Sequence, residues 1–256
     1  MKNSQGLKEV NVNKDGTLDF NSTIDLYKQY LSTPRLDWQD ALRRPVKINI
    51  FKAMCATHAK IGQNPQPIIQ EVIDSGGKLF FWSDLHLFHN NIIRYTSRPF
   101  ETVDHMNQTM IGNYWSTVTE NDVVVFGGDV GFGEVPEVIK LIQSLPGKKV
   151  LVLGNHDFDR NQAFFRNYHS FDKTTMAFVI HREVEGEIWN VIVSHYPIHE
   201  TALPKKSINI HGHIHQHLPG NKNINMSVEH TFFAPISMES KIEDLINKIK
   251  AEKNEK

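Results

Sequence analysis

Five short segments that carry histidine, aspartate or asparagine, each at the end of an apolar run, constrain the fold of this chain more than any other feature. The segments are Ser83–His86, Gly128-Asp129, Gly154–Asp157, Ser194–Pro197 and Gly212–His215. In open α/β sheets, ligand-binding groups gather in the loops that follow the carboxyl ends of the strands. If the apolar runs are strands, the five segments are therefore expected to converge on one site.

The apolar runs are predicted to be β-strands because they are short and rich in β-branched or aromatic residues. Helical apolar spacing at residues 103–115 and 134–145 separates some of them. The predicted strands are Leu79–Trp82, Val123–Phe126, Val150–Leu153, Met176–Ile180, Ile188–Val193 and Ser207–Ile210. Strands that alternate with helices predict an α/β fold, which we expect to contain two packed mixed β-sheets flanked by helices.

We divide the chain into three parts. Residues 1–76 carry helical patterns interrupted by prolines, which predicts a mainly helical N-terminal extension to which we assign no chemistry. Residues 77–238 hold all five segments and are expected to form the functional domain. Residues 239–256 predict a charged C-terminal helix, with its isoleucines and Leu245 on one face.

Composition narrows the classes of function. Of the 256 residues, 39% are hydrophobic and 22% are charged, as is typical of a soluble globular protein. The formal net charge of -1 gives no general attraction to nucleic acid or membrane. Cys55 is the only cysteine, so an internal disulfide is impossible, and no apolar run has the length of a membrane span. We therefore expect a cytoplasmic protein with no signal sequence and no membrane partner.

The residue types in the five segments are those of a metal site. The chain has 14 histidines, six of them within residues 195–217. Asp84 and His86 are separated by one residue, as are His213 and His215, so in an extended backbone each pair points to one side. Imidazole mixed with oxygen ligands suits Mn, Fe, Zn or Ni rather than calcium. Any single segment also fits a purely structural role, but the joint pattern favours metal.

Taken in order, the segments resemble the signature of the calcineurin-like metallophosphoesterase superfamily, which is Asp-x-His, Gly-Asp, Gly-Asn-His-Asp or -Glu, His, and Gly-His-x-His. The residues after the first segment are similar to a small bacterial and phage branch of phosphoesterases. The resemblance covers roughly residues 78–238. It implies a four-layer α/β/β/α sandwich that binds two divalent transition-metal ions, with Mn favoured.

Carried over by position, the resemblance implies a ligand set of seven residues. Asp84, His86 and His215 would hold the first ion, and Asn155, His195 and His213 the second. Asp129 would bridge the two ions.

The resemblance also implies hydrolysis of a phosphodiester by a hydroxide that bridges both ions, with His156 as the general acid. The alternative for His156 is a supporting role in the turn at Asn155. Asp157 would either orient the His156 ring or cap the helix that follows.

Three further residues are candidates for substrate binding, namely Arg94, Arg98 and His89. Arginine can bind phosphate through two hydrogen bonds, although a solvent-exposed helix face is the alternative for both arginines. His89 would contact substrate or pack on its own loop.

We expect a small phosphorylated substrate, with nucleotides and cyclic nucleotides as candidates. The alternatives are a phosphomonoesterase, a DNA or RNA nuclease, and a non-catalytic interaction module. A nucleic acid is the less favoured substrate because no basic groove or DNA-binding domain is visible. Gly128-Asp129 is followed by Val130–Gly133, where the protein-phosphatase branch has Asp-Arg-Gly, which argues against a phosphoprotein phosphatase.

Overall fold

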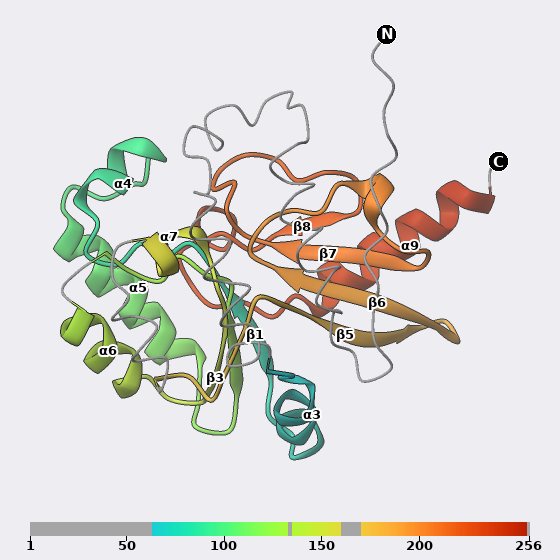
Figure 1. Cartoon of the computed structure of the whole chain (residues 1–256), viewed down its shortest axis with the longest axis horizontal. Helices are drawn as coiled ribbons and strands as arrows, with labels where there is room; N and C mark the ends of the chain where they lie inside the picture. Colours follow the sequence, from blue (N-terminus) through green and yellow to red (C-terminus); the bar gives the residue numbers. More distant parts are fainter. Residues whose placement is uncertain (1–62, 133–134, 160–169, 255–256) are drawn as a thin grey trace, which may run out of the picture.

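The computed structural model describes residues 63–132, 135–159 and 170–254 (Figure 1). The helices predicted within the first 62 residues lie outside this part of the chain. Within it, the strands form two four-stranded sheets, with strand orders β1-β2-β3-β4 and β5-β6-β7-β8.

The first sheet consists of β1 (Leu79–Trp82), β2 (Val123–Phe126), β3 (Lys148–Val152) and β4 (Lys173–Thr175). These four strands pair in parallel, and Phe81 of β1 also forms an isolated antiparallel bridge with Ile236. Parallel pairing follows from the connections, because α4 (Asn90–Tyr95) and α5 (Val103–Thr117) lie between β1 and β2 and α6 (Val135–Ser144) lies between β2 and β3.

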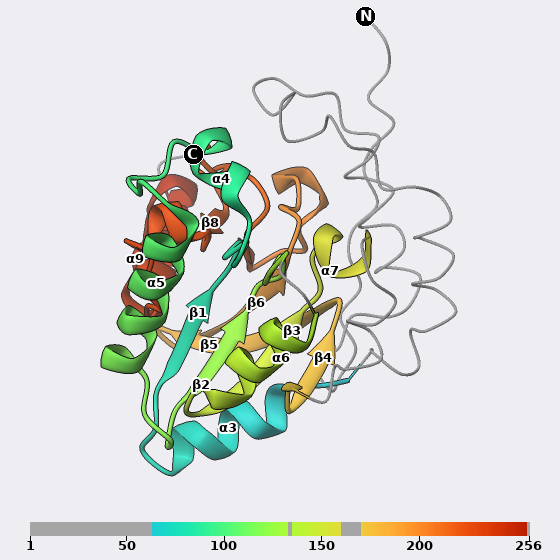
Figure 2. The same ribbon diagram turned by 90° about the vertical axis from the view of Figure 1, so that its left-hand side faces the viewer.

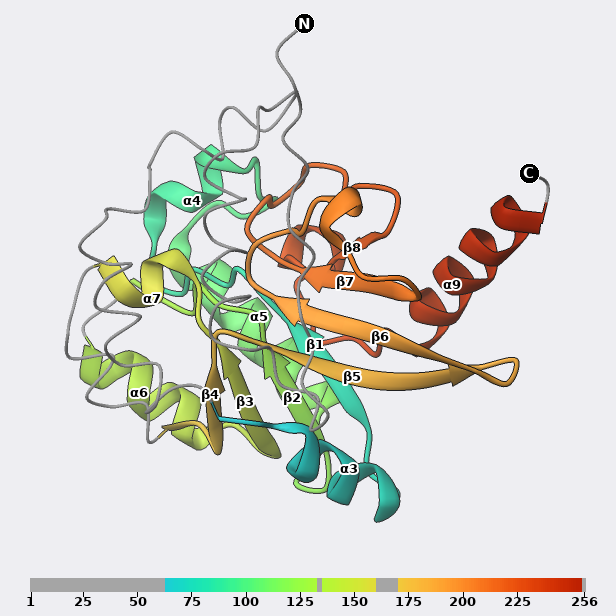
Figure 3. The same cartoon turned by 45° about the vertical axis from the view of Figure 1, so that its right-hand side comes forward.

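The second sheet is mixed, as predicted. It consists of β5 (Ala177–Val184), β6 (Glu187–Ser194), β7 (Ser207–His211) and β8 (Asn223–Asn225). β5 and β6 are antiparallel, while β6, β7 and β8 are parallel. A two-residue turn joins β5 to β6 (Figure 3), and its residues Glu185 and Gly186 both have positive φ, as such hairpin turns require.

The six predicted strands and the helices predicted at 103–115 and 134–145 are confirmed, with ends displaced by a few residues. The sequence patterns did not predict β4 and β8. Both are three residues long, and β8 contains Asn223 and Asn225, so neither provides an apolar run. Pairing with a neighbouring strand, rather than local apolar patterning, defines them.

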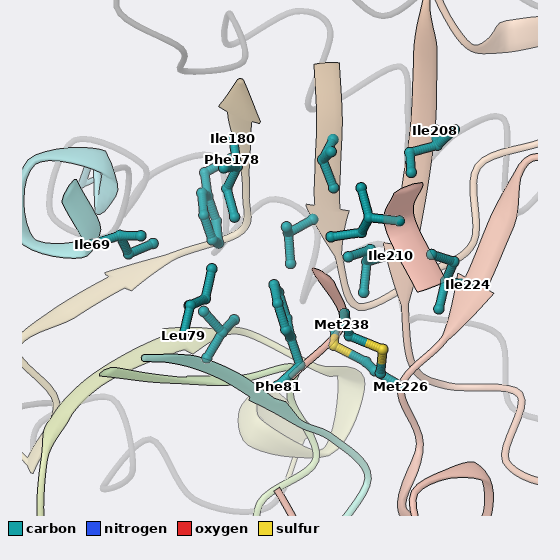
Figure 4. Close-up of a cluster of buried hydrophobic side chains, with 14 of the residues drawn as sticks. Ile69, Leu79, Phe81, Phe178, Ile180, Ile208, Ile210, Ile224, Met226 and Met238 are labelled. Atoms are coloured by element: carbon teal, nitrogen blue, oxygen red, sulfur yellow. The ribbon is translucent and has the colours of Figure 1, made fainter. Parts of the chain in front are cut away.

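The strands of the first sheet alternate between two cores, as Figure 4 illustrates for the core between the sheets. Phe80 and Trp82 pack with residues of α5 and α6 such as Met110 and Ile142. Leu79 and Phe81 face the second sheet, where they join a cluster that includes Phe178, Ile210 and Met226. The expected arrangement of two packed sheets flanked by helices is therefore confirmed.

Elements from both ends of the described chain pack into this core. α3 (Gln66–Asp74) contributes Ile69 and Val72, and α9 (Glu239–Asn254) contributes Ile242, Ile246 and Ile249. The boundaries drawn at residues 76 and 239 remain a prediction, although these contacts join both helices to the core of the central part. In the described ranges, no helix combines the length and the apolar content that crossing a membrane requires.

The predicted site segments follow the carboxyl ends of β1, β2, β3, β6 and β7. Figure 2 shows α4 and the short α7 (Asn155–Asp159) beyond the same end of the first sheet. The fold thus brings the segments to one place.

Candidate metal centre

Two groups of side chains offer metal ligands at this end of the sheets. The first group consists of Asp84, His86 and His215, and the second of Asp129, His195 and His213. Within each group the ligand atoms lie within 4.8 Å of one another. Each group combines residues from both sheets, so the site depends on the packing of one sheet against the other.

Asp129 lies between the two groups. Its Oδ2 is 3.6 Å from His86 Nε2 in the first group and 3.6 Å from His195 Nε2 in the second. Its other oxygen, Oδ1, accepts a hydrogen bond from the backbone N–H of His156 (2.8 Å), which fixes the orientation of the carboxylate. Oδ2 alone is therefore equally close to a histidine of each group, whereas the resemblance implies one carboxylate oxygen for each ion.

The ligand atoms of the second group have the spacing that one ion would impose. Two ligand atoms bound at about 2.1 Å to one tetrahedral ion lie roughly 3.4 Å apart. His195 Nε2 is 3.2 Å from His213 Nδ1 and 3.1 Å from Asn155 Oδ1. Asn155 thus joins the second group, where the sequence predicts it.

In the first group, the ring nitrogens of His86 are the clearest candidates for metal ligands. The side chain is buried, yet neither ring nitrogen has a hydrogen-bond partner among the described residues. Burial, followed by the charges of His215 and Arg98, lowers the pKa of His86 well below 6.5. A buried, neutral imidazole with a free nitrogen lone pair fits a divalent transition-metal ion, so the residues present fit the metal that the sequence predicts.

Two histidines are oriented by hydrogen bonds at Nδ1. His195 Nδ1 is 2.8 Å from the carbonyl oxygen of Gly127, and His215 Nδ1 is 3.1 Å from Glu229 Oε1. Because a carbonyl or carboxylate oxygen only accepts, each Nδ1 must carry the proton, which leaves Nε2 available as a ligand.

Asp84 is held by three donors. The backbone N–H of His213 contacts both carboxylate oxygens at 2.9 Å. The hydroxyls of Ser83 (2.7 Å) and Ser227 (2.9 Å) both donate to Oδ2. The carboxylate is therefore fixed by loops that follow β1, β7 and β8.

The backbone of the ligand segments differs from the predicted extended form. Asp84, His86, Asp129, His213 and His215 all have positive φ, between 48° and 69°. In a non-glycine residue this conformation costs roughly 1–2 kcal/mol, so the surrounding packing has to impose it. Strain at five of the seven predicted ligands is typical of a functional site.

Close packing against the ligands explains the glycine of the Gly154–Asp157 segment. A Cβ on Gly154 would lie 2.3 Å from Asp129 Oδ1, far inside van der Waals contact. No other residue type fits without moving the Asp129 carboxylate or the Asp129 backbone.

A cavity of about 550 Å³ opens onto the two groups. His156 and His89, for which roles as general acid and substrate-binding residue are predicted, both line it. The His89 ring stacks on Phe132 at 4.1 Å, and the His156 ring lies 4.7 Å from the same phenylalanine. The full lining consists of His86, His89, Ile92, Tyr95, Thr96, Asp129, Asn155, His156, His213, Ile214, His215, Gln216 and His217.

The two predicted substrate-binding arginines do not line this cavity. Arg94 is exposed, and its guanidinium lies 5.7 Å from the centre of the Tyr95 ring. Arg98 is buried and donates to Glu229 and to backbone carbonyls of the first segment. The geometry therefore favours a positioning role for Arg98 over the predicted substrate contact, because its hydrogen-bonding groups already face the protein.

Asp157 caps α7 rather than facing the His156 ring. Its Oδ2 accepts from the backbone N–H groups of Gly154 (2.8 Å) and Asp129 (2.9 Å), and Oδ1 accepts from that of Val130 (3.1 Å). The bond to Gly154, the residue before the helix, is half of a capping box. Burial and the nearby Asp129 charge raise the pKa of Asp157 to about 7, although the hydrogen bonds from Gly154 and Val130 oppose the shift.

Sequence reasoning missed Glu229, the carboxylate partner of His215. Burial raises its pKa, but the charge of His215, the hydrogen bond to it and the charge of Arg98 outweigh burial and lower the pKa to about 2. Glu229 follows β8, so it occupies the same kind of position as the predicted ligands. The sequence did not reveal this position because β8 is short and polar and was not recognised as a strand.

Comparison with known proteins agrees with this geometry. The model of the calcineurin-like phosphoesterase family matches residues 77–255, which is more than half of the chain. The chain is 32% identical over 172 residues to the uncharacterized protein MJ1445 of Methanocaldococcus jannaschii, with 63% of this chain and 88% of that protein covered. It is 25% identical over 199 residues to the gene 66 protein of Mycobacterium phage L5, with 68% and 96% covered.

Among solved structures, the protein of unknown function AQ665 from Aquifex aeolicus matches with 26% identity and a TM-score of 0.49. The match covers 65% of this chain and 98% of that one.

The fold and the two donor groups define a phosphoesterase that depends on divalent metal ions. The chain belongs to the calcineurin-like phosphoesterase family.

Proposed function

We propose that this protein hydrolyses small phosphodiesters, using two divalent transition-metal ions and His156 as the general acid. The observation that supports this most strongly is the position of Asp129 Oδ2, at 3.6 Å from a histidine of each donor group. That position fits a shared ligand between two ions better than it fits two separate sites. Manganese is the ion we favour among Mn, Fe, Zn and Ni.

When bound, two such ions would supply a nucleophilic water of lowered pKa and a positive field for the phosphate. The protein's own contribution is to hold the seven ligands without a substrate present. Asp84 is fixed by hydroxyl and backbone donors, Asp129 by the backbone of His156, and the rings of His195 and His215 by their Nδ1 hydrogen bonds. This preorganisation leaves little reorganisation for the reaction step.

His156 would protonate the leaving alkoxide. His156 lines the cavity, and its backbone N–H donates to Asp129 Oδ1, so the backbone that carries the ring is fixed relative to the carboxylate between the two donor groups. Histidine is the side chain that most often serves as a general acid or base in enzymes. In this scheme Asp157 holds the loop that carries His156 and does not touch the substrate.

The cavity lining favours a diester over a monoester. A phosphodiester carries one negative charge and a phosphomonoester carries up to two, so a monoesterase would be expected to add cationic side chains. Among the described lining residues there is neither lysine nor arginine. Ile92, Tyr95 and Ile214 give the walls apolar surface that suits the organic group of an ester, and the volume admits a nucleotide.

Substitution of His156 tests this proposal. We expect His156→Ala to lower kcat for bis(p-nitrophenyl) phosphate by about 10²–10⁴-fold, the usual contribution of a general acid. Manganese content by elemental analysis should remain near two per chain. His181→Ala is the matched control, because His181 is exposed on β5 and bonded to Asn190.

Three results would contradict the proposal. One is unchanged turnover in His156→Ala with two ions bound. Another is faster turnover of p-nitrophenyl phosphate than of the diester by the wild-type protein, which would favour a phosphomonoesterase. The third is no turnover of any ester by protein that has bound two ions, which would favour an interaction module.

A further inference from the structure

A buried ion pair lies next to the first donor group and outside the cavity. Arg98, which follows α4, contacts Glu229, which follows β8, with 2.8 Å between Nη2 and Oε1. The side chain of Arg98 is fully buried, and that of Glu229 is 7% exposed. The pair therefore joins two segments separated by 131 residues in the sequence.

The hydrogen bonds of this pair differ from the usual bidentate arrangement, in which two arginine N–H groups each donate to a different carboxylate oxygen. Arg98 directs both Nε (3.0 Å) and Nη2 (2.8 Å) to Oε1 of Glu229, and His215 Nδ1 approaches the same oxygen at 3.1 Å. Oε2 is buried and has no hydrogen-bond partner in the described part of the chain. Oε1 therefore serves three donors, one of which belongs to a predicted metal ligand.

A second ion pair of the protein shows the contrast. Arg182 and Glu239 form two parallel hydrogen bonds, Nε to Oε2 at 3.2 Å and Nη2 to Oε1 at 2.8 Å, and no other side chain shares them in the bonds seen. This pair is largely on the surface. An arginine and a glutamate that bind only each other can form these two parallel hydrogen bonds. The different arrangement of Arg98 and Glu229 therefore has to be explained by their other contacts.

The remaining donors of Arg98 supply that reason. Nη2 also donates to the carbonyl oxygen of Asp84 and Nη1 donates to that of Leu85, both at 2.7 Å. These two carbonyls belong to the peptide groups between Asp84 and His86, the ligands with φ values of 59° and 51°. Fixing both peptide planes holds the strained backbone in the form that points both side chains toward one ion.

We propose that Arg98 and Glu229 act as one positioning unit for the first metal, with Arg98 fixing the backbone of Asp84 and His86 and Glu229 fixing the ring of His215. All three ligands of the first group are then oriented by one buried ion pair. In the second group, the ring of His195 is oriented by the backbone carbonyl of Gly127 and not by this ion pair. The inference rests on the metal centre used by the proposed function and is independent of which ester is cleaved.

The test is manganese binding measured by titration calorimetry on the full chain. The wild-type protein should bind two ions. Glu229→Gln keeps the shape of the side chain and removes its charge. It should weaken manganese binding at one of the two sites by about 10–100-fold, as loss of a hydrogen-bond partner of a metal ligand does, and leave binding at the other site unchanged. Glu239→Gln removes the same charge from the surface pair and should bind both ions as the wild type does.

A second pair of variants covers the case in which Glu229→Gln does not fold, as judged by circular dichroism of the metal-free protein. Arg98→Lys keeps the charge but cannot contact Glu229 and two carbonyls together, so it should weaken the same single site. Arg182→Lys is its control.

Unchanged affinity at both sites in the folded variants would overturn the proposal, and so would an equal loss at both sites. The proposed function fails separately, if wild-type protein with two bound ions turns over no phosphoester. Metal binding and turnover therefore report on the two statements independently.

Discussion

Substitution of Gly212 by alanine should remove the first metal by displacing one ligand. Gly212 precedes His213, and its backbone lies against Asp84. A Cβ added there would be 2.2 Å from Asp84 Oδ2 and 2.2 Å from Ser83 Oγ. Ordinary van der Waals contact begins at 3.4 Å, so the carboxylate would have to retreat by about 1.2 Å (3.4 − 2.2).

The magnitude follows from what fixes Asp84. Metal–ligand distances vary by only about 0.2 Å, so a displacement of this size removes the carboxylate from the coordination sphere. It also breaks or lengthens the bonds from Ser83, Ser227 and the backbone of His213. Hydrogen bonds to charged groups contribute about 1.5–3 kcal/mol each, so the loss of stability is on the order of several kcal/mol. We expect manganese affinity at the first group to fall roughly 100-fold or more.

Titration calorimetry with Mn²⁺ and thermal unfolding measure the two effects. Gly112→Ala is the matched control, because Gly112 lies inside α5 with nothing within 4 Å of an added Cβ. Alanine is the better helix former by about 1 kcal/mol, so this variant should bind manganese normally and be at least as stable as the wild type. Wild-type affinity at both metal sites in Gly212→Ala would refute the reasoning.

Two further predictions concern buried carboxylates. Asp157→Asn replaces an acceptor oxygen by a donor, so at least one of the three backbone N–H groups that contact this side chain loses its acceptor. Each unsatisfied N–H costs about 1–3 kcal/mol, and denaturant unfolding should show a corresponding loss of stability. Equal or greater stability of the variant would contradict this. Burial raises the pKa of Asp122, but hydrogen bonds from Thr119 and from the backbone of Lys78 outweigh it and lower the pKa below 3.8. Because the folded protein favours the ionised form, the stability that Asp122 contributes is present above pH 3.8 and lost as pH falls through its lowered pKa. The stability difference between wild type and Asp122→Asn should therefore shrink in acid, and a difference that grows would contradict this assignment.

The sequence predicts most of the fold because six of the eight strands in the described ranges include a run of apolar residues. Val123–Phe126, for example, is buried along its whole length, so its composition alone identifies it. The strand Asn223–Asn225 is also buried but consists mainly of asparagine, and only its pairing with β7 makes it a strand. The positions of the predicted ligands follow from the strand ends in the same way.

What the sequence does not predict depends on contacts between distant segments. The positive φ of Asp84 and His86 is imposed by surrounding structure, since neither residue type demands it. Arginine is a common phosphate ligand, so the sequence alone suggests substrate binding for Arg98. Its guanidinium instead faces the protein interior, where it pairs with the buried Glu229 that follows β8. The capping role of Asp157 is also not predictable from the sequence, because its hydrogen bond with the backbone of Asp129 joins segments that follow two different strands.

A crystal structure grown with Mn²⁺, with anomalous scattering recorded at the manganese edge, tests the central claim most directly. Two peaks about 3.5–4 Å apart are expected, one beside His86 and His215 and the other beside His195 and His213. Asp129 should lie between them, with Oδ2 within coordination distance of both ions. A single peak, or two peaks without Asp129 between them, would contradict the assignment of a two-metal centre.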